Sequence, residues 1–115
     1  MEKVEKVWGK EIWIVNNDLY CGKILILNKG YQCSLHYHKI KDETFYILEG
    51  KVLMQIENFT KVMYPGEAIH IDTHVLHRFS GLEESKIIEF STKHFDEDSY
   101  RVEKSCKMGE KDGDR

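Results

Sequence analysis

Short runs of apolar and β-branched residues, separated by turn residues, recur along most of this chain. We expect strands over residues 11–15, 20–27, 33–38, 43–48, 51–57, 60–63, 68–71, 77–80 and 85–91. Strands at such close and regular spacing are typical of an all-β sandwich or barrel. No helical periodicity of useful length appears before residue 92. The sequence therefore predicts an all-β fold, a small antiparallel β-barrel.

Two histidines lie one residue apart in the strand predicted over 33–38. Alternate residues of a strand point to the same face, so His36 and His38 should face one interior. Glu43 follows a short polar turn, and the returning strand can aim its carboxylate at the same point. Imidazoles and a carboxylate suit divalent transition metals, among them zinc, manganese, iron, nickel and cobalt. The alternative is that two polar strands carry these histidines by chance.

Glycines frame this segment at Gly30 and Gly50. The resulting pattern is Gly, five residues, His-x-His, four residues, Glu, six residues, Gly, and it resembles the first motif of the cupin superfamily at every position. A second stretch, 64–79, opens with Tyr-Pro-Gly-Glu and resembles the second cupin motif. The resemblance implies a cupin jelly roll that holds one divalent transition metal, and it makes His77 the fourth metal ligand.

The resemblance narrows to one cupin branch. Residues 7–11 look like the Trp-Gly opening of the cupin branch of type II phosphomannose isomerases. Residues 87–91 and 97–101 look like the closing strand and the acidic-arginine tail of that branch. His36 stands where the branch often has Gln, and the similarly built D-lyxose isomerases are a further relative. The similarity implies a cupin that acts on a sugar or a sugar phosphate.

The reaction that this resemblance favours is aldose–ketose isomerisation through an enediolate. Glu89 lies inside the apolar run 87–90, where a carboxylate needs a partner or a function because burying it alone is costly. In the cavity it could act as the general base. Lys41, in the turn before Glu43, could hold a phosphate or stabilise an enediolate. We predict Glu89 and Lys41 as catalytic residues; the alternatives are a Glu89 that faces away and a solvated Lys41.

Two other functions stay open at this point. A cupin without catalysis could hold a sugar or another small molecule, as a sensor or as an accessory to a carbohydrate pathway. An iron-dependent dioxygenase is the third possibility, because three histidines and one glutamate also suit oxygen chemistry. Metal identity separates this third possibility from isomerisation, and sugar binding without turnover would favour the second.

Length, composition and charge limit the domain number, the partners and the compartment that we expect for this chain. A chain of 115 residues makes one domain, which we place at residues 1–102, and the charged residues 103–115 are predicted to form a disordered tail. A net charge of −3 argues against nucleic-acid binding, which favours a basic face. No run approaches the roughly 18 apolar residues of a membrane span, and no apolar signal peptide opens the chain. With three cysteines that lack a pairing pattern, these features predict a cytoplasmic protein.

Three further expectations concern partners and neighbours of the site. Small cupins commonly pair through their sheets, and pairing covers exposed edge strands, so the resemblance implies a homodimer. Its other partner is expected to be a small molecule of carbohydrate type. Arg78 directly follows His77 and should point away from it, toward an ion pair, whereas His94 is expected to belong to the segment that trails the last strand.

Overall fold

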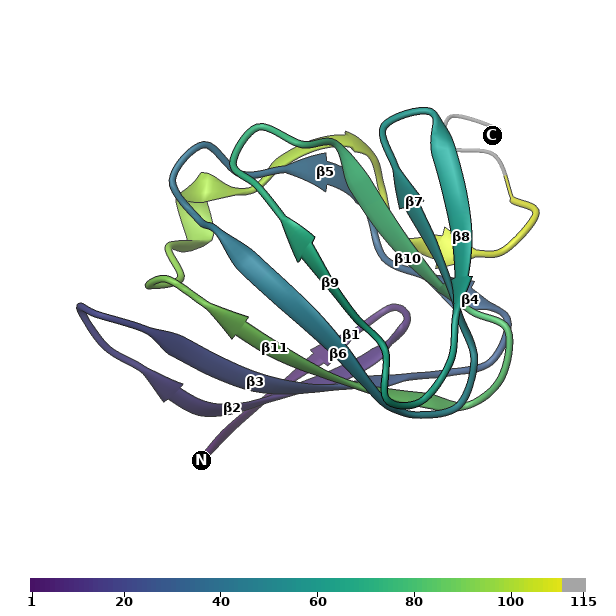
Figure 1. Ribbon diagram of the computed structural model, residues 1–115, viewed down its shortest axis with the longest axis horizontal. Helices are drawn as coiled ribbons and strands as arrows, with labels where there is room; N and C mark the ends of the chain where they lie inside the picture. Colours follow the sequence, from purple (N-terminus) through teal and green to yellow (C-terminus); the bar gives the residue numbers. More distant parts are fainter. Residues whose placement is uncertain (111–115) are drawn as a thin grey trace.

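Almost all of the regular structure is β-strand (Figure 1). The computed structural model describes residues 1–110. The strands are β1 (Glu2–Lys6), β2 (Gly9–Asn16), β3 (Cys21–Leu27), β4 (Tyr31–Gln32), β5 (Leu35–Tyr37), β6 (Glu43–Glu49), β7 (Val52–Ile56), β8 (Phe59–Met63), β9 (Ala68–Ile71), β10 (His77–Gly81), β11 (Ser85–Ser91), β12 (Tyr100–Glu103) and β13 (Cys106–Lys107). One turn of 3₁₀ helix, η1 (Asp96–Asp98), interrupts them.

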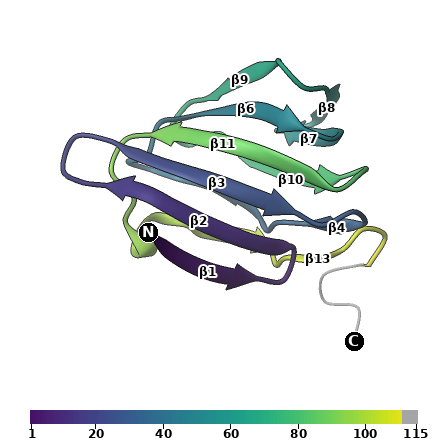
Figure 2. The same ribbon diagram turned by 90° about the horizontal axis from the view of Figure 1, so that it is seen from below.

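The strands form two antiparallel sheets. The first runs in the order β1-β2-β3-β11-β6-β9, and Figure 2 shows these strands side by side. The second runs β12-β5-β10-β4-β13, and β7 joins it by pairing with both β10 and β8. The predicted all-β jelly-roll barrel is confirmed. Among residues 1–110, no helix is long and apolar enough to cross a membrane.

Inward and outward side chains alternate along the central strands. In β3 every second residue is buried, beginning with Cys21, and the residues between them are half-buried. The buried side chains of both sheets pack into one apolar core between the sheets. Its members are Trp8, Leu25, Leu27, Cys33, Phe45, Ile47, Val52, Met54, Met63, Ile71, Phe79 and Ile87.

Polar residues occupy several inward positions of the first sheet. The paired residues Leu25, Ile87 and Ile47 make an apolar row across β3, β11 and β6. In the next inward row, Lys23 of β3 pairs with Glu89 of β11, and both are buried. The interior is therefore apolar in one part and charged in another, and the charged part is where the site lies.

The motif glycine Gly50 lies in the turn that joins β6 of the first sheet to β7 of the second. Its φ of +93° is a conformation that residues with a side chain rarely adopt. A Cβ atom at this position would lie 2.2 Å from Ser85 Oγ and 2.4 Å from the carbonyl oxygen of Glu84. Glycine is therefore required by both the turn and the close approach of the β11 strand.

The predicted disordered tail is wrong for residues 103–110. Glu103 ends β12, and β13 pairs with β4 through Cys106, whose side chain is buried. Arg78 makes the predicted ion pair, with a distance of 2.9 Å from its Nη1 to Glu103 Oε1. Strands this short leave no periodic signal, and their partners come from far earlier in the chain, so composition alone misled the prediction. Residues 111–115 of the predicted tail lie outside the described residues.

Candidate metal centre

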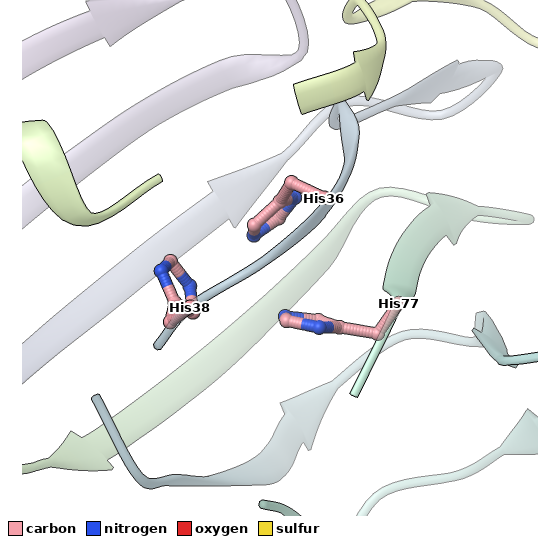
Figure 3. A group of neighbouring side chains, drawn as sticks. All are labelled: His36, His38 and His77. Atoms are coloured by element: carbon pink, nitrogen blue, oxygen red, sulfur yellow. The ribbon is translucent and has the colours of Figure 1, made fainter. Parts of the chain in front are cut away.

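Three histidines from the second sheet and the loop beside it converge on one point. His36 of β5 and His77 of β10 are register partners, and His38 follows β5 directly. Figure 3 shows the three rings turned toward one another. One ring nitrogen from each lies within 4.8 Å of the other two. Two of these residues come from a spacing pattern and the third from a distant segment, and the fold brings all of them together.

Glu43 adds a carboxylate to the same cluster. It is the first residue of β6 and is buried. Its Oε2 lies 3.0 Å from His77 Nε2 and 3.3 Å from His38 Nε2. Burial raises the pKa of the Glu43 carboxyl, but the facing imidazoles of His38 and His77 and the nearby Lys41 ammonium outweigh it and hold that pKa well below its usual range.

Each of the three imidazoles donates its Nδ1 hydrogen to a backbone carbonyl oxygen. The pairs are His36 with Ser34 at 2.7 Å, His38 with Asp98 at 3.0 Å, and His77 with Val75 at 2.9 Å. A carbonyl only accepts, so Nδ1 must carry the hydrogen and Nε2 of a neutral ring keeps its lone pair. Burial, and then the electrostatic influence of the neighbouring His77, lower the pKa of His36 to about 3, so its ring is neutral near pH 7.

This donor set fits a divalent transition metal. Among the described residues, Glu43 Oε2 and His77 Nε2 are buried polar atoms without a hydrogen-bond partner. Buried polar atoms are seldom left without a partner, and a shared cation would satisfy both. Histidine rings held by backbone carbonyls, with their other nitrogens turned to a common point, are the usual arrangement of metal-binding imidazoles.

A cavity of about 460 Å³ opens beside the cluster, and Lys41 and Glu89 line its wall. Neither is a surface residue, since each is less than 5% exposed. Lys41 Nζ lies 2.6 Å from Glu89 Oε2 and 3.6 Å from Glu43 Oε1. Burial lowers the pKa of Lys41, but the two carboxylates outweigh it and raise that pKa above its usual value. The structure thus places a charged ammonium and a carboxylate, in contact with each other, next to the candidate metal ligands.

The comparison with known protein families agrees with this geometry. Residues 23–90, more than half of the chain, match the family described as the cupin domain. The chain belongs to the cupin family. The match contains His36, His38, Glu43 and His77, the candidate ligands of this cupin.

Individual relatives of this cupin are distant. It is 30% identical over 112 residues to a D-lyxose/D-mannose isomerase of Thermosediminibacter oceani, and the match covers 74% of this chain. The chain spans 62% of the length of that relative. KdgF from a Halomonas species has a TM-score of 0.72 at 19% identity, covering 76% of this chain and 81% of the other. Ectoine synthase from P. lautus has a TM-score of 0.76 at 13% identity, covering 95% and 86%. These two likenesses establish the fold.

Three cavity residues of this cupin were not foreseen. His94, expected in a trailing segment, lines the cavity with its ring centroid 5.0 Å from that of Trp13. Lys23 and Glu11 also line it. The signal for Lys23 was present in the sequence, because a lysine occupies an inward position of the alternating run in β3. His94 left no such signal, since it lies in a loop whose path depends on the whole fold.

Asp98 joins the C-terminal part of this cupin to the metal centre. Its buried carboxylate accepts hydrogen bonds from the backbone N–H groups of Lys39, Ile40 and Lys41, at 2.9, 3.2 and 2.9 Å. Its carbonyl oxygen is the acceptor that holds the ring of His38. One residue therefore fixes both the turn that carries Lys41 and the orientation of a candidate ligand.

Proposed function

We propose that this cupin binds one divalent transition metal through His36, His38, Glu43 and His77 and isomerises an aldose to a ketose. Zinc, manganese, iron, nickel and cobalt all suit these ligands. The observation that carries the proposal is the meeting of four metal-binding side chains with the Lys41–Glu89 pair in one cavity. A bound metal supplies Lewis acidity that polarises a carbonyl group.

The proposed general base is Glu89. Within residues 1–110, its Oε2 accepts both of its hydrogen bonds, one from Ser91 Oγ at 3.0 Å and one from Lys41 Nζ. Oε1 is thus the oxygen with capacity to take a proton from the carbon beside the carbonyl and return it to the neighbouring carbon. Lys41 holds the carboxylate in place, and its ammonium stabilises the substrate oxygen on which negative charge develops.

The substrate we propose is a carbohydrate, either a free sugar or a sugar phosphate. Support comes from the relative named as an isomerase of D-lyxose and D-mannose. Because the chain spans 62% of that relative, a cupin that binds a sugar without converting it is the second candidate. An iron-dependent dioxygenase is the third, favoured by the three-histidine, one-glutamate set.

We also propose a cytoplasmic homodimer that binds neither nucleic acid nor membrane. The three cysteines are free and buried, in keeping with a reducing compartment. The outward face of the first sheet supports pairing, because Ile12, Ile24, Ile88 and Tyr46 lie opposite one another on β2, β3, β11 and β6. These half-buried side chains make a continuous apolar row, which a second copy could cover.

The first experiment is a measurement of metal content in the purified protein and in the His36→Ala and His77→Ala variants. About one equivalent in the parent, lost in both variants, is expected if the four residues form the site. The parent is then assayed for conversion of D-lyxose and D-mannose with each metal. No metal in the parent, even after reconstitution, would rule out the proposed centre.

A second variant separates catalysis from binding. Glu89→Gln should retain the metal and lose at least about 100-fold in turnover, the usual contribution of a general base. Sugar binding without turnover in the parent would favour the binding protein, and activity confined to iron with oxygen uptake would favour the dioxygenase.

A further inference from the structure

Lys23 is buried at an inward position of β3, where an apolar residue would complete the core. It is only 1% exposed. Burying an ammonium is costly unless other groups compensate its charge and bind its hydrogens. Its Nζ lies 3.2 Å from Glu11 Oε1, 3.4 Å from His94 Nδ1 and 4.2 Å from the ring centroid of Trp13. Because burial of this ammonium is unfavourable for folding, a function in binding would account for a lysine at this position.

His94 cannot satisfy Lys23 fully. Its Nε2 lies 3.0 Å from Asp96 Oδ1, a carboxylate that accepts, so Nε2 carries the hydrogen and Nδ1 has a single lone pair. Lys41 Nζ approaches this lone pair at 3.2 Å, closer than Lys23 does. Burial, with the two ammoniums, lowers the pKa of His94, so the ring stays neutral. Among the residues that the structure describes, Lys23 therefore has fewer hydrogen-bond acceptors than its three donor hydrogens.

Glu11 has the complementary excess. Its Oε1 accepts from Trp13 Nε1 at 2.7 Å and from Lys23. Within residues 1–110, its Oε2 has only Lys6 nearby, at 3.9 Å, which is too far for a hydrogen bond. Burial raises the pKa of Glu11, but the charges of Lys23 and Lys6 outweigh it and lower that pKa, so the group is a carboxylate at neutral pH. An acceptor with spare capacity thus lies beside a donor with spare capacity.

We propose that Lys23 and Glu11, beside His94, form a second ligand-binding subsite in the cavity, one that takes neighbouring hydroxyl groups of an uncharged polyhydroxylated ligand. This inference rests on the proposed function, in which a sugar occupies the cavity. One hydroxyl oxygen accepts from Lys23 while its neighbour donates to Glu11. Hydroxyl groups suit such a wall because each can both donate and accept.

A phosphate is disfavoured at this subsite by the arrangement of charge. Lys23 is paired with Glu11, and Lys41 with Glu89, so neither buried ammonium is free to neutralise a further anion. Asp96 lies on the far side of His94 and adds another negative charge. A phosphorylated ligand would have to separate a buried ion pair, and doing so leaves a carboxylate uncompensated.

The subsite adjoins the proposed base. Trp13, Lys23 and Glu89 are successive register partners on β2, β3 and β11. β3, which carries Lys23, is two strands away from β6, which carries Glu43, and two strand spacings amount to about 10 Å. Glu43 pairs with Ser91, two residues beyond Glu89 on the intervening β11. A ligand bound at the metal centre would pass Glu89 before it reaches Lys23.

The test begins with the metal-loaded parent protein. D-mannose and D-mannose 6-phosphate are titrated by calorimetry, and the indole N–H resonance of Trp13, assigned with the Trp13→Phe variant, is followed by NMR. We expect D-mannose to bind and to move this resonance, because the indole donates to Glu11. Tighter binding of the phosphate, or binding of D-mannose that leaves the resonance unmoved, overturns the inference.

Variants isolate the contribution of Lys23. Lys23→Met keeps a stem of similar length without the ammonium, and the matched control is Lys86→Met on β11, where Lys86 pairs with Glu49 at the surface. Lys23→Met should weaken D-mannose binding about 10- to 100-fold, because a hydrogen bond from a charged group typically contributes that factor to affinity. Lys86→Met should match the parent, and both variants should keep the parent's metal affinity.

The outcomes distinguish this inference from the proposed function. Metal-dependent binding of D-mannose that is equal in Lys23→Met and the parent overturns the subsite and leaves the metal centre and the isomerase intact. Absence of any sugar binding to the metal-loaded parent overturns both. If Lys23→Met does not fold, the Trp13 resonance of the parent still decides the question.

Discussion

The ring of His36 is held in its neutral form by its surroundings. Burial, and then the electrostatic influence of the neighbouring His77, lower its pKa from 6.5 to about 3, whereas in the unfolded chain it takes up a proton near 6.5. Between these values the unfolded state binds more protons than the folded state. The neutral ring of His36 presents Nε2 to the other candidate ligands. Protonation of this nitrogen should therefore oppose both folding and metal binding.

We predict that the contribution of His36 to the free energy of unfolding of the metal-free protein is complete above about pH 6.5. This contribution is lost progressively as the pH falls toward 3. Urea unfolding at pH 7.5, 6 and 5 measures the trend. The His36→Asn variant should show a flatter dependence on pH over this range. Equal slopes in the two proteins would contradict the assignment of the effect to His36.

Single residues were predictable from sequence where their spacing carried the information. His36 lies in β5 and His38 directly follows it, and the two-residue period of an extended chain alone predicts that they face the same side. Glu89 was predicted because a charged residue interrupts an apolar run. The same argument applies to Lys23, whose inward position becomes clear only when the register of β3 is known. His94 lies in a loop, so no periodicity could have placed it in the cavity.

At the scale of elements, the turn between β5 and β6 depends on a distant residue. The carboxylate of Asp98 accepts hydrogen bonds from three successive backbone N–H groups of this turn, and its carbonyl holds His38. Of these groups, the N–H of the buried Lys41 would be left unsatisfied without this charged acceptor, and the two part-buried N–H groups before it would lose the contact that holds the turn. The turn also carries Lys41, so its geometry bears on both the metal centre and the proposed catalytic pair.

We predict that Asp98→Ala lowers the free energy of unfolding by about 3 kcal/mol and weakens metal binding about 10- to 100-fold. Chemical denaturation and competition with a chelator measure the two effects. Glu97→Gln, an exposed neighbour in the same 3₁₀ turn, is the matched control and should resemble the parent. Unchanged metal affinity in Asp98→Ala would show that the turn holds its shape without this carboxylate.

The strands that carry apolar runs were predicted well, whereas β1, β4, β12 and β13 were not predicted. The alternating runs of β3, β6, β7 and β11 agree with their predicted ranges to within a few residues. β13 has two residues, too few to show a period, and it exists because β4 offers it a partner. Sequence patterns report which face of a strand is buried, whereas the pairing of short strands is decided by the assembled fold.

At the scale of the whole molecule, metal binding should be coupled to folding. The four candidate ligands come from β5, the loop after it, β6 and β10, which belong to two different sheets. A cation bound to all of them stabilises only the folded state, in which they are close together.

We predict that metal at 100 times its dissociation constant stabilises the protein by about 2.7 kcal/mol. Thermal unfolding with and without the metal, and after addition of a chelator, measures this. His77→Ala should show no such gain. A parent protein whose unfolding temperature is indifferent to every divalent metal tested would contradict the proposed centre.

The outward apolar row of the first sheet leads to a prediction about assembly. Ile24→Lys places a charge at the centre of this row and should convert the proposed homodimer to a monomer. Leu53→Lys, the same change at a half-buried position of β7 in the other sheet, is the matched control and should leave the dimer intact. Sedimentation measures the mass. A parent that is monomeric at all concentrations would refute the proposed pairing.

The contact between Asp98 and His38 also sets an order of events during synthesis. Asp98 comes 60 residues after His38, which at translation speeds of about 5–20 residues per second is a delay of about 3–12 s. During this interval the nascent chain carries its histidines without the carbonyl that orients one of them. The orientation of His38 by this carbonyl therefore waits until the segment that contains Asp98 has been synthesised, and so does completion of the proposed metal centre.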